Sequence, residues 1–322
     1  MAQTSTPLTI SLLNTAHNHI QEMSADSEGY ASSDAYEIVR KISSTKHADI
    51  FEGVRMRDLK RCIVKPAKEV GRHRIEQEIK MLRSLQGGTN IPNLYDVVQD
   101  NQTEPLSVVF EYIENTDFRS LYPRFSAEDV RYYMKELLKA VEFSHSKGVM
   151  HRDIRPHNIM IDHSQRKLRL FNWDYADVYV PNSRYSVRVS YGFIKAPELL
   201  LHYEEYDCSS DMWNFGMVFA SLIFRKEPFI HGNSIFHILQ AIARVLGTKG
   251  LLNYVEKYDI ETDPDGVDAI PYYEKRSWES FFSEGNERYR SDEAVDLLDK
   301  LLRWDHKQRL TAAEALKHAY FN

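Results

Sequence analysis

The chain has 322 residues, of which 43% are hydrophobic and 27% charged, enough for one large two-lobed domain or two small domains with a buried core. Its formal net charge of -6 at pH 7 argues against direct binding to nucleic acid, because affinity for phosphate backbones depends on a basic surface. The only two cysteines, Cys62 and Cys208, are far apart in the sequence, so neither a disulfide framework nor a zinc site is indicated.

Residues 1–35 are rich in Ser, Thr, Asn and Asp and show little apolar periodicity, which predicts a flexible N-terminal tail. A weak apolar patch at residues 8–13 could dock as a short helix. The first 20 residues lack a basic segment followed by a long apolar core, so no secretory signal is predicted. The longest apolar run, residues 217–224, is too short to cross a bilayer, and we expect a nuclear or cytoplasmic protein without membrane contact.

Short strand-like runs follow the tail and predict a small antiparallel sheet. They lie at residues 36–42, 49–54, 61–65, 93–98 and 106–112. One helix is expected between the third and fourth runs, at residues 72–85, because Ile75, Ile79 and Leu82 recur at helical spacing.

Beyond residues 111–114 the pattern is mostly helical. A long helix is predicted to begin after Ser126, a favourable N-cap, and to end near Gly148. Further helices are expected at residues 209–224, 234–246, 293–302 and 311–317. The change of pattern at residues 111–114 predicts a hinge between a β-rich lobe and a helical lobe, with a ligand cleft between the two.

Four residues match the needs of phosphoryl transfer, which requires a cation on the phosphates, a carboxylate near the attacking hydroxyl and ligands for metal ions. Lys65 ends a predicted strand, and Glu78 on the following helix could hold it. Asp153 and Asn158 lie in HRDIRPHN, residues 151–158, between the long helix and a predicted strand pair. Each signal alone also fits a structural role, since a lone Lys–Glu pair is commonly an exposed ion pair and a His-Arg pair can tether a loop.

Taken together, these residues and three further motifs resemble a eukaryotic protein kinase. The motifs are APEL at 196–199, SDMWNFG at 210–216 and HKQRLTAAEA at 306–315. Within that superfamily, residues 36–322 are most similar to the catalytic alpha subunit of casein kinase II, as in GVMHRDIRPHNIMIDHSQRKLRLFNW. The resemblance implies an α+β, two-lobed protein kinase fold with a tail at 1–35, an N-lobe at 36–112 and a C-lobe at 113–322.

The resemblance also implies a nucleotide site. Phe110 would lie at the back of the pocket, and residues 111–113 would form the hinge that binds adenine. The residues implied to contact the nucleotide are Ser43, Thr45, Ile50, Ile63, Lys65, Phe110, Glu111 and Ile113. Asp211 is implied to brace the catalytic loop, and Glu198 with Arg309 to form a buried structural ion pair.

The nucleotide loop departs from the family pattern. Residues 42–49, ISSTKHAD, contain no glycine, and Ser43 and Thr45 stand at the family's glycine positions. A Cβ there hinders the close approach of backbone N–H groups to phosphate. A Ser/Thr-rich turn can still offer hydroxyl and backbone donors, so the expected loss is graded.

The metal triplet departs as well, because Asn172, Trp173 and Asp174 stand where the family has Asp-Trp-Gly. A neutral amide thus replaces an anionic magnesium ligand, and Asn158, Asn172 and Asp174 would hold the metal weakly or not at all. Loss of about 4 kcal/mol of transition-state stabilisation would slow transfer about a thousandfold. If the strand continued through this triplet, positions 172 and 174 would face the same side, and Asp174 could serve as a displaced metal ligand.

Two surfaces are implied by the resemblance. The first would attract acidic protein segments and comprises Arg72, Arg74, Arg155, Arg188 and Lys195, although a solvated basic face is an equal reading. The second would bind a regulatory subunit like the beta subunit of casein kinase II and comprises Ile38, Phe51, Val64, Val98 and Val109. These strand residues also fit a place in the core.

Three functions remain open at this point. The leading hypothesis is a casein kinase II alpha-like pseudokinase that acts as a binding or scaffolding subunit. The alternatives are a weak Ser/Thr protein kinase that uses ATP and magnesium on acidic substrates, and a switch that binds ATP without turnover.

Overall fold

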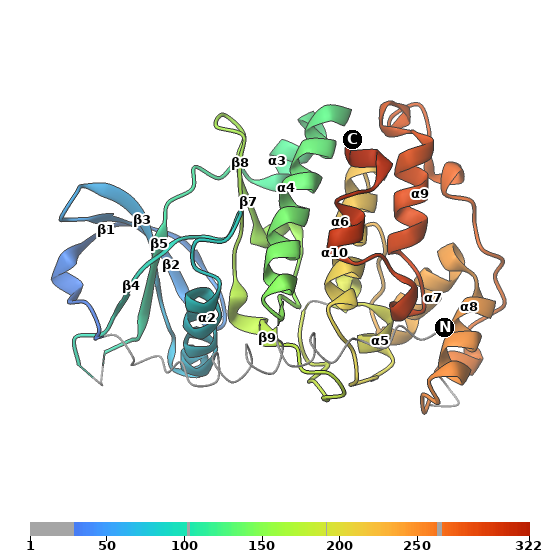
Figure 1. Ribbon diagram of the computed structural model, residues 1–322, viewed down its shortest axis with the longest axis horizontal. Helices are drawn as coiled ribbons and strands as arrows, with labels where there is room; N and C mark the ends of the chain where they lie inside the picture. Colours follow the sequence, from blue (N-terminus) through green and yellow to red (C-terminus); the bar gives the residue numbers. More distant parts are fainter. Residues whose placement is uncertain (1–28, 102–103, 191, 263–265) are drawn as a thin grey trace.

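The structure is a computed structural model that describes residues 29–101, 104–190, 192–262 and 266–322. A strand-rich part and a larger helical part lie side by side along the long axis (Figure 1). This is the two-lobed α+β arrangement that the resemblance implies. The connection between the lobes follows the last strand of the sheet, at the position where the sequence predicts a hinge.

The N-lobe holds one five-stranded antiparallel sheet in the order β1-β2-β3-β5-β4. Its strands are β1 (Tyr36–Ser44), β2 (Asp49–Arg55), β3 (Lys60–Pro66), β4 (Leu94–Val98) and β5 (Ser107–Glu111). Helix α2 (Arg72–Ser84) turns Ile75, Ile79 and Leu82 into the core. All five predicted strands and the predicted helix are confirmed, and in the helix the spacing of the apolar residues marks the buried face.

Residues 29–35, which the sequence assigns to a flexible tail, are packed against the sheet. The backbone N–H of Ala31 donates to Val97 at 2.9 Å, and that of Ser33 donates to the Asp100 carboxylate at 2.8 Å. The expectation of a tail up to residue 35 is therefore wrong for these residues. Residues 1–28, including the predicted apolar patch at 8–13, lie outside the described residues.

The C-lobe is built around α4 (Ala127–Ser146) and α6 (Ser209–Phe224). Ser126 and Asp129 form a reciprocal capping box at the start of α4, and Gly148 adopts a positive φ of 71° just beyond its end. Both predicted ends of this helix are thus confirmed. Almost every side chain of α6 is buried, so this helix forms the centre of the lobe.

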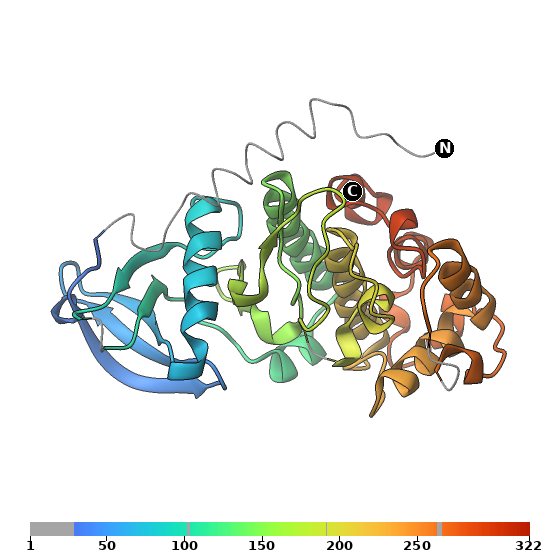
Figure 2. The ribbon, with the colours of Figure 1, turned by 90° about the horizontal axis from the view of Figure 1, so that it is seen from below.

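The remaining C-lobe elements surround these two helices (Figures 1 and 2). The helices are α3 (Phe118–Leu121), α5 (Pro197–Leu200), α7 (Ile235–Leu246), α8 (Thr248–Lys257), α9 (Asp292–Leu301) and α10 (Ala312–Ala315). Two small antiparallel pairs join β6 (Val149–Met150) to β9 (Asp177–Val178) and β7 (Ile159–Asp162) to β8 (Lys167–Leu170). Among the described residues no single helix is long and apolar enough to span a membrane, and only α7 and α8 together, bent by 114°, reach such a length and composition.

A buried ion pair ties two distant C-lobe segments together. The Arg309 guanidinium donates two hydrogen bonds of 2.7 Å to the Glu198 carboxylate, and both side chains are fully buried. Charge and hydrogen bonds are matched within the pair, which is the condition under which buried ions are tolerated. The structural role expected for these two residues is confirmed.

Candidate active site

A buried ion pair links the sheet to α2 in the cleft between the lobes. Lys65 Nζ lies 2.6 Å from Glu78 Oε2, and both side chains are at least nine-tenths buried. Burial raises the pKa of Glu78, while the charge of Lys65 acts in the opposite direction. The backbone N–H of Trp173 donates to the other Glu78 oxygen at 3.1 Å, so α2 is fixed against both the sheet and the C-lobe.

Asn172 completes a closed set of contacts around Lys65. Its amide oxygen accepts a hydrogen bond from Lys65 Nζ at 3.0 Å, and its amide nitrogen donates to Asp174 Oδ1 at 2.9 Å. Burial raises the pKa of Asp174, and the nearby Lys65 opposes this. Both polar groups of the Asn172 amide are therefore engaged by neighbouring side chains.

The backbone at this point is not a strand. Strand β8 ends at Leu170, Asn172 adopts a left-handed conformation with φ 66°, and a 3-10 turn follows at Trp173–Tyr175. Asn is one of the few residues other than Gly that adopts this conformation readily. The idea that strand alternation aligns residues 172 and 174 is wrong, although the turn still brings their side chains into contact.

The loop that replaces the glycine-rich segment is closed on itself. Strand β1 continues through Ser44, so only residues 45–48 form the connection. The Thr45 hydroxyl accepts hydrogen bonds from the backbone N–H groups of His47 (3.2 Å) and Ala48 (3.1 Å) and donates to the Ala48 carbonyl (3.0 Å). Three of the donors that a Ser/Thr-rich turn was expected to offer, the Thr45 hydroxyl and these two N–H groups, are thus engaged within the turn.

This turn is also anchored to the segment between β3 and α2. Lys68 Nζ donates to Ser44 Oγ at 2.8 Å and to the Thr45 carbonyl at 2.6 Å. The His47 carbonyl accepts from the Lys68 N–H and lies so close to Gly71 that a Cβ there would meet it at 1.9 Å. A loop held at these points is not free to fold over a triphosphate.

Three polar residues of the segment 151–158 bond to one another through their side chains. Asp153 is 1% exposed, and its Oδ2 accepts hydrogen bonds from Asn158 Nδ2 (2.8 Å) and Arg155 Nε (3.1 Å). Burial raises the pKa of Asp153, whereas the charge of Arg155 opposes the rise. A carboxylate with a raised pKa beside a basic group has the character of a general base.

Asp211 on α6 braces this loop from behind. Its carboxylate accepts the backbone N–H groups of His151 (2.8 Å) and Arg152 (2.7 Å) and a bond from His145 Nε2 (2.9 Å). Full burial lowers the pKa of His151 to about 4, so this imidazole is neutral near pH 7. The bracing role implied for Asp211 is present in the structure.

The residues that the resemblance implies to contact a nucleotide differ in their exposure and in their partners. Phe110 and Ile113 are buried, and the Phe110 ring meets Phe171 edge-on with centroids 5.9 Å apart. Ile50 and Ile63 are half-buried on β2 and β3, while Ser43 is exposed on β1. Glu111 differs, because its backbone N–H donates to Asn93 and its side chain is paired with two basic residues of the C-lobe.

A cavity of about 810 Å³ lies between the turn at residues 45–48 and the C-lobe, and none of Ile50, Ile63 and Phe110 lines it. Its lining includes Asn172 and Asp174 together with basic side chains from four separate segments. These basic residues are Lys46, Arg74, Arg119 and Arg155. Sequence reasoning missed Lys46 and Arg119, because residues so far apart give no local signal of their convergence.

The five residues expected to bind acidic segments do not form one surface. Arg74 and Arg155 line the cleft, and the Arg74 guanidinium stacks on the Tyr175 ring at 4.0 Å. Arg72 pairs with Glu76 on its own helix, and Arg188 is exposed. Lys195 Nζ donates to the Val187 carbonyl at 2.9 Å.

The five residues expected to bind a partner lie on the outer face of the sheet. Val64, Val98 and Val109 are buried there in a small cluster against which Tyr36 and Tyr95 pack. Phe51 is half-buried at the edge of this cluster, and Ile38 is 49% exposed. The structure therefore leaves mainly two of the five side chains accessible.

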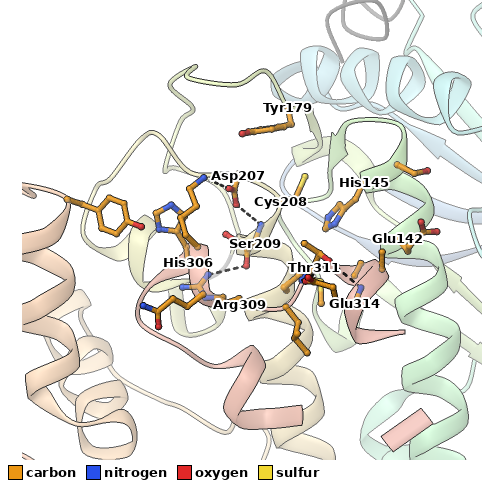
Figure 3. Close-up of a pocket in the computed structure, with 18 of the residues that line it drawn as sticks. Glu142, His145, Tyr179, Asp207, Cys208, Ser209, His306, Arg309, Thr311 and Glu314 are labelled. Atoms are coloured by element: carbon orange, nitrogen blue, oxygen red, sulfur yellow. Dashed lines mark hydrogen bonds and ion pairs between the residues drawn. The ribbon is translucent and has the colours of Figure 1, made fainter. Parts of the chain in front are cut away.

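A second cavity, of about 1300 Å³, lies in the C-lobe, where its lining includes Asp207, His306 and Arg309 (Figure 3). His145 reaches it from α4, and Lys307 bridges to Asp207 at 2.5 Å across it. Because His145 also bonds to Asp211, only two contacts separate this cavity from the backbone of the catalytic loop. None of the predicted catalytic or nucleotide-binding residues lines it.

A magnesium ion does not fit the residues at the metal position. The Asn172 oxygen that would face the metal instead faces the ammonium group of Lys65, and magnesium favours anionic oxygen ligands. Within the described parts of the chain, no group of three or more His, Cys, Asp or Glu side chains is placed to hold a metal ion.

The model of the protein kinase domain matches residues 36–321, which is most of the chain. The chain therefore belongs to the protein kinase domain family.

Proposed function

We propose that this chain is a casein kinase II alpha-like pseudokinase with impaired or absent phosphotransfer, acting as a binding or scaffolding subunit. One observation carries the proposal: the Asn172 amide bonds to Lys65 at 3.0 Å and to Asp174 at 2.9 Å. A nucleotide would have to break these contacts to reach Lys65. It would then gain no anionic metal ligand at this position.

The closed turn at residues 45–48 supports the same proposal. Kinases place backbone N–H groups of this loop on the phosphates of ATP. Here two such groups bind the Thr45 hydroxyl. Phosphate and metal contacts are thus weakened independently, by separate segments of the chain.

A phosphotransfer assay with ATP, magnesium and an acidic peptide tests this function. We expect the wild-type chain to transfer no more phosphate than the Asp153→Ala variant. The double variant Asn172→Asp with Asp174→Gly restores the family triplet, and we expect it to gain at least a hundredfold in rate. Wild-type turnover far above that of Asp153→Ala would contradict the proposal.

A weak Ser/Thr kinase is the second candidate, and the geometry around Asp153 favours it. Asp153 keeps its hydrogen bond from Asn158 and is braced by Asp211 through the loop backbone. Lys65 and Glu78 also keep the ion pair that active kinases require.

Thermal unfolding with ATP distinguishes the candidates, because a ligand that binds the folded state raises its stability. If ATP raises the unfolding temperature only in the presence of magnesium, and phosphate is transferred, the result supports the kinase. If ATP raises the unfolding temperature with or without magnesium, the result supports an ATP-binding switch.

We further propose that a regulatory beta-like subunit binds the outer face of the N-lobe sheet and that acidic protein segments bind the basic cleft. Exposed Ile38 and half-buried Phe51 support the first proposal, and the basic lining of the cleft supports the second. Ile38→Asp should weaken capture of a purified beta subunit at least tenfold, whereas Leu59→Asp, a change at an even more exposed apolar residue, should not. Equal effects of both changes would contradict the assignment.

A further inference from the structure

The connection between the lobes carries an ion cluster around a buried carboxylate. Glu111 ends β5 in the N-lobe, and its side chain is 7% exposed. Its Oε1 accepts from Arg169 Nε at 2.6 Å, and its Oε2 accepts from Lys167 Nζ at 2.8 Å. Both basic residues belong to β8 in the C-lobe, so the cluster crosses from one lobe to the other.

The sequence of β8 explains how one strand supplies both cations. Side chains alternate along a strand, so Lys167 and Arg169 face one side while Leu168 and Leu170 face the other. Both leucines are buried in the main core. The strand is therefore anchored by its apolar face and presents its two cations together to Glu111.

A second interlobe contact lies beside this cluster. Asn90, in the connection between α2 and β4, donates from Nδ2 to the Glu136 carbonyl (2.9 Å) and carboxylate (2.7 Å) on α4. Its own carbonyl accepts the Leu170 N–H at 3.0 Å. Asn90 holds a positive φ of 60°, a conformation in which Asn is enriched.

We propose that Glu111, Lys167, Arg169 and Asn90 form an interlobe clamp that holds the two lobes at a fixed angle without nucleotide. Bending at residues 112–116 would separate the Glu111 carboxylate from its two cations. A carboxylate that is buried and loses its partners is far less stable than one that is exposed. The clamp presents the cleft and the surfaces on both sides of it in one constant arrangement, as a scaffold requires.

Amide hydrogen exchange of the full-length chain tests the clamp, because exchange reports local opening. In Glu111→Gln we expect residues 112–116 and β8 to exchange about tenfold faster than in wild type, with α6 unchanged. The matched control is Glu114→Gln, since Glu114 lies in the same connection and pairs with Arg61 at 2.6 Å. That pair is exposed at both ends, so its loss should leave the exchange of residues 112–116 within about twofold.

Equal exchange rates of residues 112–116 in Glu111→Gln and Glu114→Gln would overturn the proposal. An increase in Glu111→Gln that extends equally over α6 would also overturn it. If Glu111→Gln does not fold, Lys167→Gln provides a milder change, because this side chain is 34% exposed. It should accelerate exchange at the same two segments by a smaller factor, and no local acceleration would likewise overturn the proposal. Phosphotransfer does not enter this measurement, so the clamp stands or falls independently of the proposed function.

Discussion

The variant Asn172→Asp probes the closed contacts around Lys65 most sharply. Without rearrangement, the oxygen that replaces Nδ2 would lie 2.9 Å from Asp174 Oδ1, while the other carboxylate oxygen would stay 3.0 Å from Lys65 Nζ. At an effective dielectric constant of about 20, each of these charge interactions amounts to about 6 kcal/mol, and the two nearly cancel. The remaining effects are the loss of the hydrogen bond to Asp174 and repulsion from the nearby Glu78. Together they should lower the free energy of unfolding by about 2 kcal/mol.

Magnesium should reverse this cost. With three carboxylates around a single ammonium group, the variant would have the anionic oxygen ligands that the wild type lacks. A ligand at a hundred times its dissociation constant stabilises the folded state by about 2.7 kcal/mol. We therefore expect Asn172→Asp to unfold about 3 °C below wild type without magnesium and near the wild-type temperature with it.

Thermal unfolding followed by calorimetry, with and without saturating magnesium, measures both effects. Asn182→Asp is the matched control, because Asn182 also has a positive φ but is exposed. Its unfolding temperature should equal that of the wild type and should not rise when magnesium is added. The reasoning is refuted if magnesium stabilises the wild type as much as Asn172→Asp, or if Asn172→Asp is as stable as wild type without magnesium.

Three further predictions concern the turn, the buried ion pair and pH. Thr45→Gly should bind ATP about tenfold more tightly by calorimetry than wild type, because two backbone donors are released, whereas Thr45→Ser should not; equal affinities would contradict this. Glu198→Gln should cost about 3–5 kcal/mol in urea unfolding, because it leaves the buried Arg309 charge uncompensated, and a cost below about 1 kcal/mol would oppose it. The pKa of His151 is lowered to about 4, so its contribution to stability is complete above pH 6.5 and is lost as the pH falls toward 4, by about 3 kcal/mol. His151→Asn should flatten that part of the stability profile, and an unchanged profile would exclude His151 as its source.

Much of the fold could be predicted because its elements follow simple periodicity. The buried positions of α2 and α4 recur at helical spacing, and the strands of the sheet read as short apolar runs. Helix α8 was missed, since only Thr248, Leu251 and Tyr254 are buried in it and they give a weak pattern. Residues 29–35 were mistaken for tail because their order comes from pairing with β4 rather than from their own composition.

The sequence names candidate site residues but does not give the orientation of their side chains. The sequence indicates that Asn172 replaces an anion, yet the direction of its amide depends on the left-handed backbone at that residue. The polar groups of the turn at residues 45–48 could be counted, but their pairing with one another depends on the shape of the turn. Lys46 and Arg119 reach the cleft from distant segments, which only the folded chain brings together.

The central claim is that the Asn172 position leaves the cleft unable to support phosphoryl transfer. Its most direct test is the rate of phosphate transfer from ATP to an acidic peptide in saturating magnesium. This rate is compared between the wild type and the double variant that combines Asn172→Asp with Asp174→Gly. The account predicts a wild-type rate equal to that of Asp153→Ala and a rate at least a hundredfold higher in the double variant. A wild-type rate equal to that of the double variant, and abolished by Asp153→Ala, would contradict it.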